Sequence, residues 1–191
     1  MAIANIINDT TLSGNSGTGA FVGSTSPSLV TSTIGVASAT SMFFTSTAGI
    51  IGTTTNDSAD AGSVGEIISS YIPLASAVSL TTNTDQDITS ISLTAGDWDV
   101  WGNAGVTGDS STDLDRATYW VSATSATIPD ASLYVRRYYG QLISLITGDV
   151  RTIPALRFSL SGTTTIYLSA NAVFTVSTLD GFGNLLAQRV R

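Results

Sequence analysis

Three residue types with distinctive chemistry are missing from this 191-residue chain: cysteine, histidine and lysine. Without cysteine there are no disulfides and no thiol nucleophiles, and without histidine there is no histidine-based catalytic triad. The absence of both excludes Cys/His zinc sites and leaves only oxygen ligands, which suit Ca²⁺ or Mg²⁺. We therefore expect a protein that is not an enzyme, has no catalytic residue and needs no cofactor.

Charge is also scarce. Only 11% of the residues are charged, and the seven basic residues, all arginine, stand against fourteen acidic ones, which gives a net charge of −7. Nucleic-acid binding needs a positive surface, so we expect none. No apolar run approaches the ~20 residues of a membrane helix, and the first residues lack the basic start of a signal peptide. The expectation is synthesis in the cytoplasm and no membrane insertion.

Residues 1–13 form a short apolar segment that is too small to fold alone. Its apolar side chains would be costly to leave in water. We interpret the segment as an arm that docks on a larger partner, and the alternative is a disordered terminus. The predicted docking residues are Ile3, Ile6, Ile7 and Leu12.

Residues 14–62 are nearly uncharged, and apolar residues such as Phe21, Met42, Phe43 and Phe44 are spaced by Gly, Ser and Thr. Few residues here favour a helix, which indicates extended segments and turns. Such segments cannot bury both faces alone, whereas three copies wound together could. The pattern therefore favours an interwoven trimeric stem, and the alternative is a flexible Ser/Thr/Gly linker.

Residues 63–191 follow a turn-rich acidic stretch, Asn56 to Gly62, and alternate as strands do. Trp98, Val100 and Val106 take one face of a predicted strand and Trp101 the other, a period of two that marks a half-buried strand. The break at Ala95-Gly96 indicates a hairpin-like turn. The predicted strands are Ile67–Ile72, Val78–Leu80, Ile88–Leu93, Trp98–Val106, Ala117–Ala123, Ser132–Tyr138, Gln141–Ile146, Ala155–Leu160, Thr164–Val176 and Asn184–Arg189. Together they predict an all-β antiparallel sandwich, a jelly roll if its connections are Greek keys.

Acidic residues offer few candidate sites. Asp109, Asp113 and Asp115 alternate on one predicted loop and could chelate Ca²⁺, but the stretch lacks the Gly and closing Glu of a known calcium loop, so a solvated loop is the alternative. Asp97 and Asp99 flank Trp98 on the outer face of their strand. No basic partner is evident there, which argues against a glycosidase carboxylate pair.

Aromatic and arginine side chains give the candidate contact residues. Trp, Tyr and Arg are enriched at the centres of protein interfaces, and outward aromatic rings also stack on sugars. We predict packing between subunits near a threefold axis, with contact to a receptor as the alternative. The predicted residues are Trp101, Trp120, Tyr134, Arg136, Arg137, Tyr138 and Tyr139.

A family resemblance emerges from two parts of the chain. The run Gly14 to Phe44, GNSGTGAFVGSTSPSLVTSTIGVASATSMFF, resembles the shaft repeat of bacteriophage tail fibres. The matching positions are Gly17, Gly19, Phe21, Val22, Thr25, Ser26, Pro27, Leu29, Gly35, Ala37, Ala39, Thr40 and Ser41. Long fibres carry the repeat in tandem, whereas this chain carries it once, which fits a short fibre.

The second part resembles the head domain that closes many short phage fibre proteins. It comprises Ala95–Val106, Val121–Asp130 and Ile153–Arg191, and departs from the family pattern at Gln188 and Phe182, where Arg and Tyr are usual. The resemblance implies a trimeric jelly roll of the tumour-necrosis-factor or C1q type.

Taken together, the resemblance implies a virion structural protein made in the host cytoplasm. It would be a homotrimeric fibre or spike that attaches through residues 1–13 to the capsid, tail or baseplate and presents residues 63–191 to a host-surface glycan or protein. The alternative is a protein that decorates the capsid or baseplate without binding a receptor. A secreted C1q-like lectin and a glycan-cleaving enzyme are less favoured.

Overall fold

The computed structural model describes residues 54–144 and 149–191, and Thr54–Arg191 form one compact unit. The predicted stem, 14–62, lies outside these residues except for its last nine. The predicted arm, 1–13, lies outside them altogether.

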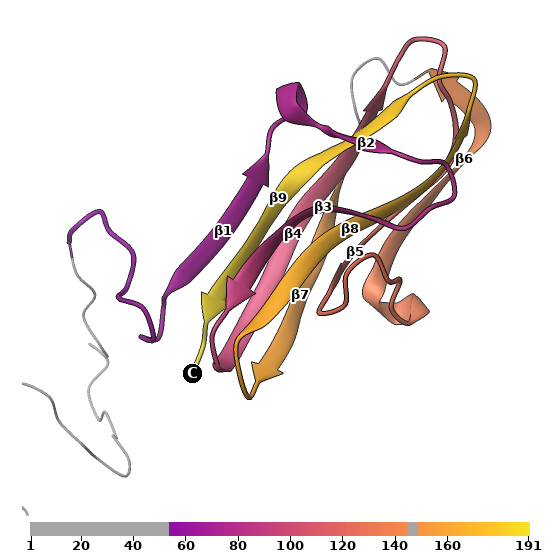
Figure 1. The fold of residues 1–191 in the computed structure, drawn as a ribbon. Coiled ribbons are helices and arrows are strands. Elements are labelled where there is room, and N and C mark those ends of the chain that lie inside the picture. Colours follow the sequence, from indigo (N-terminus) through magenta and orange to yellow (C-terminus); the bar gives the residue numbers. More distant parts are fainter. Residues whose placement is uncertain (1–53, 145–148) are drawn as a thin grey trace, which may run out of the picture. The chain divides into compact units, whose positions relative to one another are not determined.

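Nine antiparallel strands and two single-turn 3-10 helices make up the described chain (Figure 1). The strands are β1 (Ile67–Ile72), β2 (Val78–Leu80), β3 (Gln86–Leu93), β4 (Gly96–Gly108), β5 (Asp113–Ser122), β6 (Tyr134–Ser144), β7 (Asp149–Leu160), β8 (Thr164–Thr175) and β9 (Leu179–Arg189). The helical turns are Leu74–Ser76 and Ala131–Leu133. In these residues, no helix has the length and apolar character needed to cross a membrane.

The strands form two sheets packed face to face. One has the order β1-β9-β4-β7, with β2 also paired to β9, and the other has the order β3-β8-β5-β6. From β3 to β5, and again from β6 to β9, consecutive strands alternate between the two sheets. Two sheets with four main strands each, connected in this way, form a jelly roll, and β2 is a fifth, short strand of the first sheet. The predicted all-β antiparallel sandwich is therefore confirmed.

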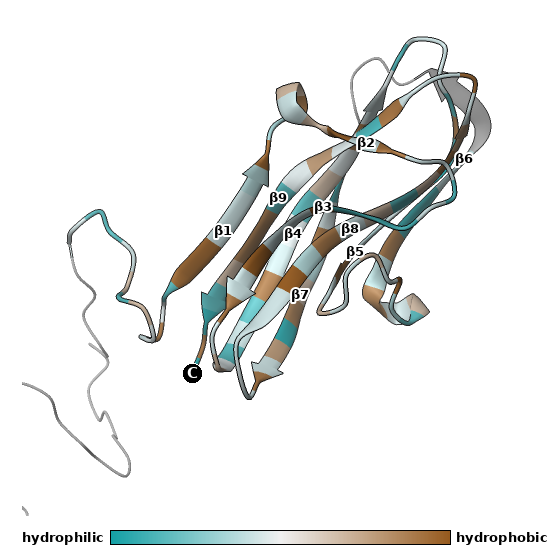
Figure 2. Ribbon diagram, viewed as in Figure 1, coloured by the Kyte–Doolittle hydropathy of each residue, from teal (hydrophilic) through white to brown (hydrophobic). Residues whose placement is uncertain are grey.

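The core lies between the sheets and follows from the alternation of side chains. Trp98, Val100 and Val106 of β4 and Ile166 and Leu168 of β8 are fully buried. Burial of each such side chain contributes about 1.5–3 kcal/mol. Brown apolar bands alternate with pale or teal bands along the strands (Figure 2), as half-buried strands require.

Two sequence-based expectations about the strands are wrong. The break at Ala95-Gly96 is not a hairpin, because β3 and β4 belong to different sheets; alternation marks where a strand ends but not which neighbour the next strand joins. The predicted strands Ser132–Tyr138 and Gln141–Ile146 overlap a single strand, β6, which runs from Tyr134 through Gly140 to Ser144 without interruption; residues 145 and 146 lie outside the described residues.

The two rims of the sandwich differ. Where the edge strands β1 and β3 meet, the hydroxyl oxygens of Ser70 and Thr89 lie 2.6 Å apart in a hydrogen bond. At the opposite rim, between β6 and β7, a shallow pocket is lined mainly by the apolar side chains of Leu133, Val135, Ile153, Pro154 and Leu156.

Candidate functional surface

Most of the predicted contact residues lie on β6, and its pairing with β5 divides them between two faces. Tyr134, Arg136 and Tyr138 lie opposite Trp120, Thr118 and Arg116, respectively. Directly opposed side chains in an antiparallel pair point to the same side of the sheet. These side chains therefore share the outer face of the β3-β8-β5-β6 sheet, away from the core.

Arg136 is held in a defined position on this outer face. Its Nε donates a 2.8 Å hydrogen bond to Thr118 Oγ1, and its guanidinium lies 4.5 Å from the centre of the Tyr134 ring. Nη1 also reaches the Tyr138 hydroxyl at 3.5 Å. The Tyr138 side chain itself is 65% exposed.

Arg116 lies beside Arg136 on the same face. Its Nη2 donates to Asn83 Oδ1 at 3.0 Å and approaches Asn171 Oδ1 at 3.5 Å. Asn171 in turn donates to Asp85 Oδ1 at 2.6 Å, so Asp85 bonds to that amide. We call Arg116, Tyr134, Arg136 and Tyr138 the arginine face.

Arg137 and Tyr139 take the other side of β6, at the rim facing β7. Asp149 accepts a hydrogen bond from the Tyr139 hydroxyl and forms ion pairs with Arg151 at 2.6 Å and Arg137 at 3.7 Å. Burial, together with the bond to Asp149, raises the pKa of Tyr139. The Tyr139 ring packs against the core, so this group joins the two sheets and leaves little of Tyr139 for a partner.

The two tryptophans predicted to face outward behave differently. Trp101 is half-buried on the outer face of β4. Trp120 is fully buried, so its predicted exposure to a partner is wrong. Alternation does direct Trp120 outward, but the chain after β5 folds back over this region. Asp87 accepts hydrogen bonds from Ala126 of that connection and from Ser169, the partner of Trp120 on β8.

The outer face of the β1-β9-β4-β7 sheet is aromatic and amide-rich around Trp101. Leu186 lies opposite Trp101, and Phe182 lies opposite Gly105, where an added Cβ would fall 2.8 Å from the Phe182 ring. Asn184 accepts a 3.0 Å bond from the Asn103 N–H. Tyr71 on β1 is 68% exposed and lies opposite Asn184. We call Tyr71, Trp101, Phe182 and Leu186 the tryptophan face.

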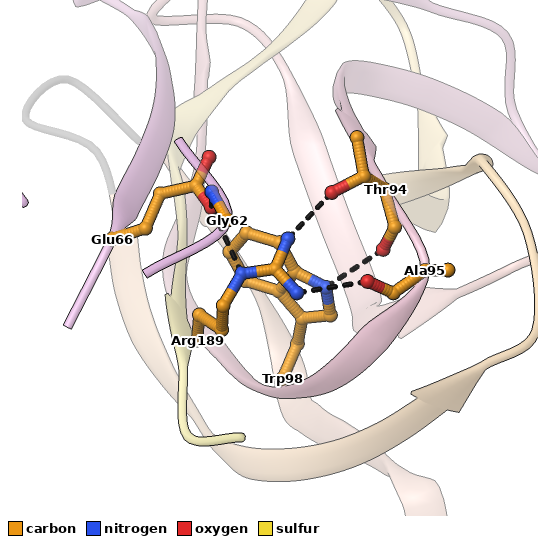
Figure 3. A network of polar contacts seen from close by, with 6 residues as sticks. All are labelled: Gly62, Glu66, Thr94, Ala95, Trp98 and Arg189. Carbon is orange, nitrogen blue, oxygen red and sulfur yellow. Dashed lines mark hydrogen bonds and ion pairs between the residues drawn. The ribbon is translucent and has the colours of Figure 1, made fainter. Parts of the chain in front are cut away.

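A buried polar network lies at the end of the sandwich where the chain finishes β9 (Figure 3). Arg189 is 5% exposed and forms a 2.9 Å ion pair with Glu66. Its guanidinium lies 4.3 Å from the Trp98 ring centre, and its Nη atoms donate to Ala95 O and to the Thr94 hydroxyl. The Gly62 N–H, and then Arg189, lower the pKa of Glu66.

This network connects two segments of the head-like resemblance. Trp98 belongs to Ala95–Val106, and Arg189 belongs to Ile153–Arg191; the two residues are directly paired between β4 and β9. Sequence reasoning placed Trp98 in the core but did not identify its partner. The sequence does contain a signal for this pair: Glu66 is the single glutamate of the chain, and Arg189 lies at the other end of the same charge-poor domain.

The surroundings of Asp97 differ from those expected from the sequence. It has two basic partners, Arg157 at 3.1 Å and Arg191 at 2.8 Å, and it is only 3% exposed. A hydrogen bond from Ser159, followed by the two arginine charges, lowers its pKa. The expectation of no basic partner is wrong because both arginines come from distant parts of the sequence. The arrangement is an ion-pair cluster that ties the C-terminal residues to β4.

The predicted calcium residues are not assembled into a site. Asp109 accepts bonds from the Ser111 N–H at 2.9 Å and the Ser111 hydroxyl at 2.7 Å, which lower its pKa and close the turn before β5. Asp113 and Asp115 lie further along, on β5. Among residues 54–144 and 149–191, no group of three or more acidic side chains is arranged to hold a metal.

The remaining predicted site lies beyond what the structure describes. The docking residues Ile3, Ile6, Ile7 and Leu12 all precede residue 54, so docking stays a prediction.

Comparison with known proteins gives only a distant structural likeness. No protein-family model and no curated protein matches the chain. Among solved structures, the infectious bursal disease virus VP2 subviral particle is 12% identical, with a TM-score of 0.40, over 74% of this chain and 37% of that one. The Gx strain of the same virus is 14% identical, with a TM-score of 0.38, over 74% of this chain and 36% of that one. The chain thus spans little more than a third of either, and no functional conclusion rests on them.

Proposed function

We propose that this protein is a bacteriophage virion structural protein, a short trimeric fibre or spike whose jelly-roll head attaches to the host surface. The observation that carries the proposal is the order of two family resemblances along one chain. A shaft-like run, Gly14 to Phe44, precedes a head-like part that folds as a jelly roll. Within that head, Trp98 and Arg189, from two separate resembling segments, stack on each other.

The surface of the sandwich supports association between copies. Each chain carries a net charge of −7, so copies repel one another, and contact through uncharged side chains avoids adding like charges at short range. The four side chains of the tryptophan face are themselves uncharged and are aromatic or aliphatic, of the kind enriched at interface centres, and Asp99 lies at the edge of the face, two residues before Trp101 on β4. The tryptophan face is therefore the surface we expect to bury between subunits. A trimer would present three equal sites, and their combined avidity would offset weak single contacts.

The solution mass of the full-length protein tests the trimer. Light scattering is expected to give a species near 59 kDa, three times the 19.6 kDa chain. The variant Trp101→Glu, which places a charge on the tryptophan face, should shift the population towards the monomer. The matched variant Ser90→Glu, at an exposed position on the other sheet, should not. A wild-type mass of 19.6 kDa would contradict the trimer and favour a decorating protein that orders its first residues only on the particle.

Membership of the virion needs a separate measurement. Mass spectrometry of particles purified from infected cells should detect the chain at a constant ratio to the major capsid protein. Its absence from purified particles would overturn the proposal, whatever its oligomeric state in solution.

A further inference from the structure

The arginines of this acidic chain fall into two classes. Five of the seven lie within 4 Å of a carboxylate: Arg137, Arg151, Arg157, Arg189 and Arg191. Arg116 and Arg136 make no such pair with any acid of the described chain, which includes every acidic residue except Asp9. In a protein with twice as many acids as bases, two arginines without a carboxylate partner are unexpected.

These two arginines are also neighbours. Arg116 lies opposite Tyr138, and Arg136 lies opposite Thr118, so the two occupy diagonal positions on β5 and β6. Diagonal positions in an antiparallel pair are roughly 7–8 Å apart, within reach of long side chains. Two like charges at this separation repel each other, and an anion bound between them would relieve the repulsion.

The donors of both guanidiniums are only partly used. Within the described chain, Arg116 bonds through Nη2 alone, and only to amide oxygens, whereas its Nε is enclosed by the protein and is not accessible to a ligand. Arg136 Nε is used by Thr118, which fixes the side chain and leaves the outer nitrogens with only the long contact to Tyr138. Arginine recognises carboxylates through a fork of parallel N–H donors, so an oxyanion is the group that these donors fit.

Aromatic rings flank the pair and indicate what carries the anion. Tyr134 lies beneath Arg136, and Tyr138 is exposed beside it. A tyrosine ring offers an apolar face with a hydroxyl at its edge, which suits the mixed surface of a sugar ring. Asn83, which is exposed, adds an amide group that can bond to a hydroxyl. A highly charged polyanion would be repelled by the overall charge of −7.

We propose that the arginine face binds an acidic saccharide, a mostly neutral sugar chain carrying isolated carboxylate groups, with Arg116 and Arg136 on the carboxylate and Tyr138 against a sugar ring. The choice of a saccharide rests on the proposed attachment function, whereas the anion site rests on the unpaired arginines alone.

The test is calorimetric titration of the full-length protein with an oligogalacturonate of about six units in which all but one or two carboxyl groups are methyl-esterified; we call this probe oligogalacturonate. A maltooligosaccharide of the same length serves as the neutral control, inorganic phosphate as a free anion, and hexaglutamate as an acidic peptide. Oligogalacturonate should bind at least about tenfold more tightly than the neutral maltooligosaccharide, because only the charged sugar offers a carboxylate to the guanidiniums. It should also bind more tightly than phosphate and hexaglutamate, because only the sugar chain offers a ring to Tyr138. Equal binding of the neutral sugar, the phosphate or the peptide would overturn the proposal, as would no binding of oligogalacturonate.

Variants locate the site. Arg136→Gln should weaken oligogalacturonate binding about tenfold or more, and Tyr138→Ala, at an exposed position, should weaken it several-fold without affecting folding. Arg157→Gln removes the same charge from the other sheet, where Arg157 pairs with Asp97, and should change the affinity less than about twofold. An equal loss in Arg136→Gln and Arg157→Gln would show a general charge effect and overturn the site.

The two proposals can fail separately. A chain found in virions that does not bind oligogalacturonate would leave the proposed function standing and remove the acidic-saccharide site. A chain that binds oligogalacturonate through Arg136 but is absent from virions would do the reverse.

Discussion

Two arginines in this molecule stack on aromatic rings at nearly the same distance, yet they occupy opposite environments. Arg189 lies 4.3 Å from the Trp98 ring centre, and Arg136 lies 4.5 Å from that of Tyr134. Arg189 is nearly fully buried and pairs with Glu66, whereas Arg136 is partly exposed and has no carboxylate partner among the described residues. The ring contact is shared, so it cannot account for the difference.

The difference is explained by desolvation. A guanidinium removed from water must have its charge and its donors satisfied by the protein, because an unpaired buried charge is very costly. The Arg189 network meets this demand with a carboxylate, a hydroxyl and a carbonyl oxygen. Water can still solvate Arg136, so the fold does not require a counter-charge there. The donors that the fold leaves unpaired are the ones available to a ligand.

The largest effect should come from Arg189→Gln. This change leaves Glu66 buried without its ion pair and removes the cation from Trp98, so the free energy of unfolding should fall by about 3–5 kcal/mol. The matched change Arg136→Gln loses the hydrogen bond to Thr118 and the ring contact with Tyr134, and should cost no more than about 1–2 kcal/mol. Urea denaturation followed by tryptophan fluorescence measures both values. Equal losses in the two variants would contradict the division into a structural and a ligand-binding arginine.

A somewhat smaller effect is expected from Gly96→Ala, which disturbs the same network through the backbone. Gly96 has a φ of +138°, and an added Cβ would fall 2.1 Å from Arg189 Nη1, which is fixed by its bonds. The backbone strain alone should cost about 1–3 kcal/mol. Gly162→Ala is the control: its Cβ would meet nothing within 4 Å, and its cost should stay within about 0.5 kcal/mol. An unchanged free energy of unfolding in Gly96→Ala would mean that Arg189 can move aside freely.

The sequence predicted local features of this fold well. The bounds of β1 and β2 match the expected Ile67–Ile72 and Val78–Leu80, and Trp98 lies in the core as its alternation required. These features depend on neighbouring residues along one strand, which a period of two reports directly.

Features that depend on distant residues were not predictable in the same way. The partners of Asp97 lie 60 and 94 positions further along the chain, and Trp120 is covered by a connection whose path is set by Asp87 on β3. Alternation assigns a face to each residue but does not say whether a loop will cover that face. The sequence predicted the β6 residues of the arginine face. It did not predict that Arg116 belongs to this face, because that follows only from the pairing of β5 with β6.

The smallest effect, and the one most specific to the buried network, is a dependence on pH. The pKa of Glu66 is lowered in the folded state, mainly by the Gly62 N–H and then by Arg189, so the ionised carboxylate stabilises the fold above the unfolded-state value near 4.5. That contribution is lost as the pH falls through the folded-state pKa. Between about pH 6 and pH 3, the free energy of unfolding should therefore decline less steeply in Glu66→Gln than in the wild type. Asp97 and Asp109 also have lowered pKa values, so a residual slope should remain in the variant. Parallel slopes for the two proteins would mean that Glu66 is protonated equally in the folded and unfolded states, and that hydrogen bonding rather than charge pairs it with Arg189.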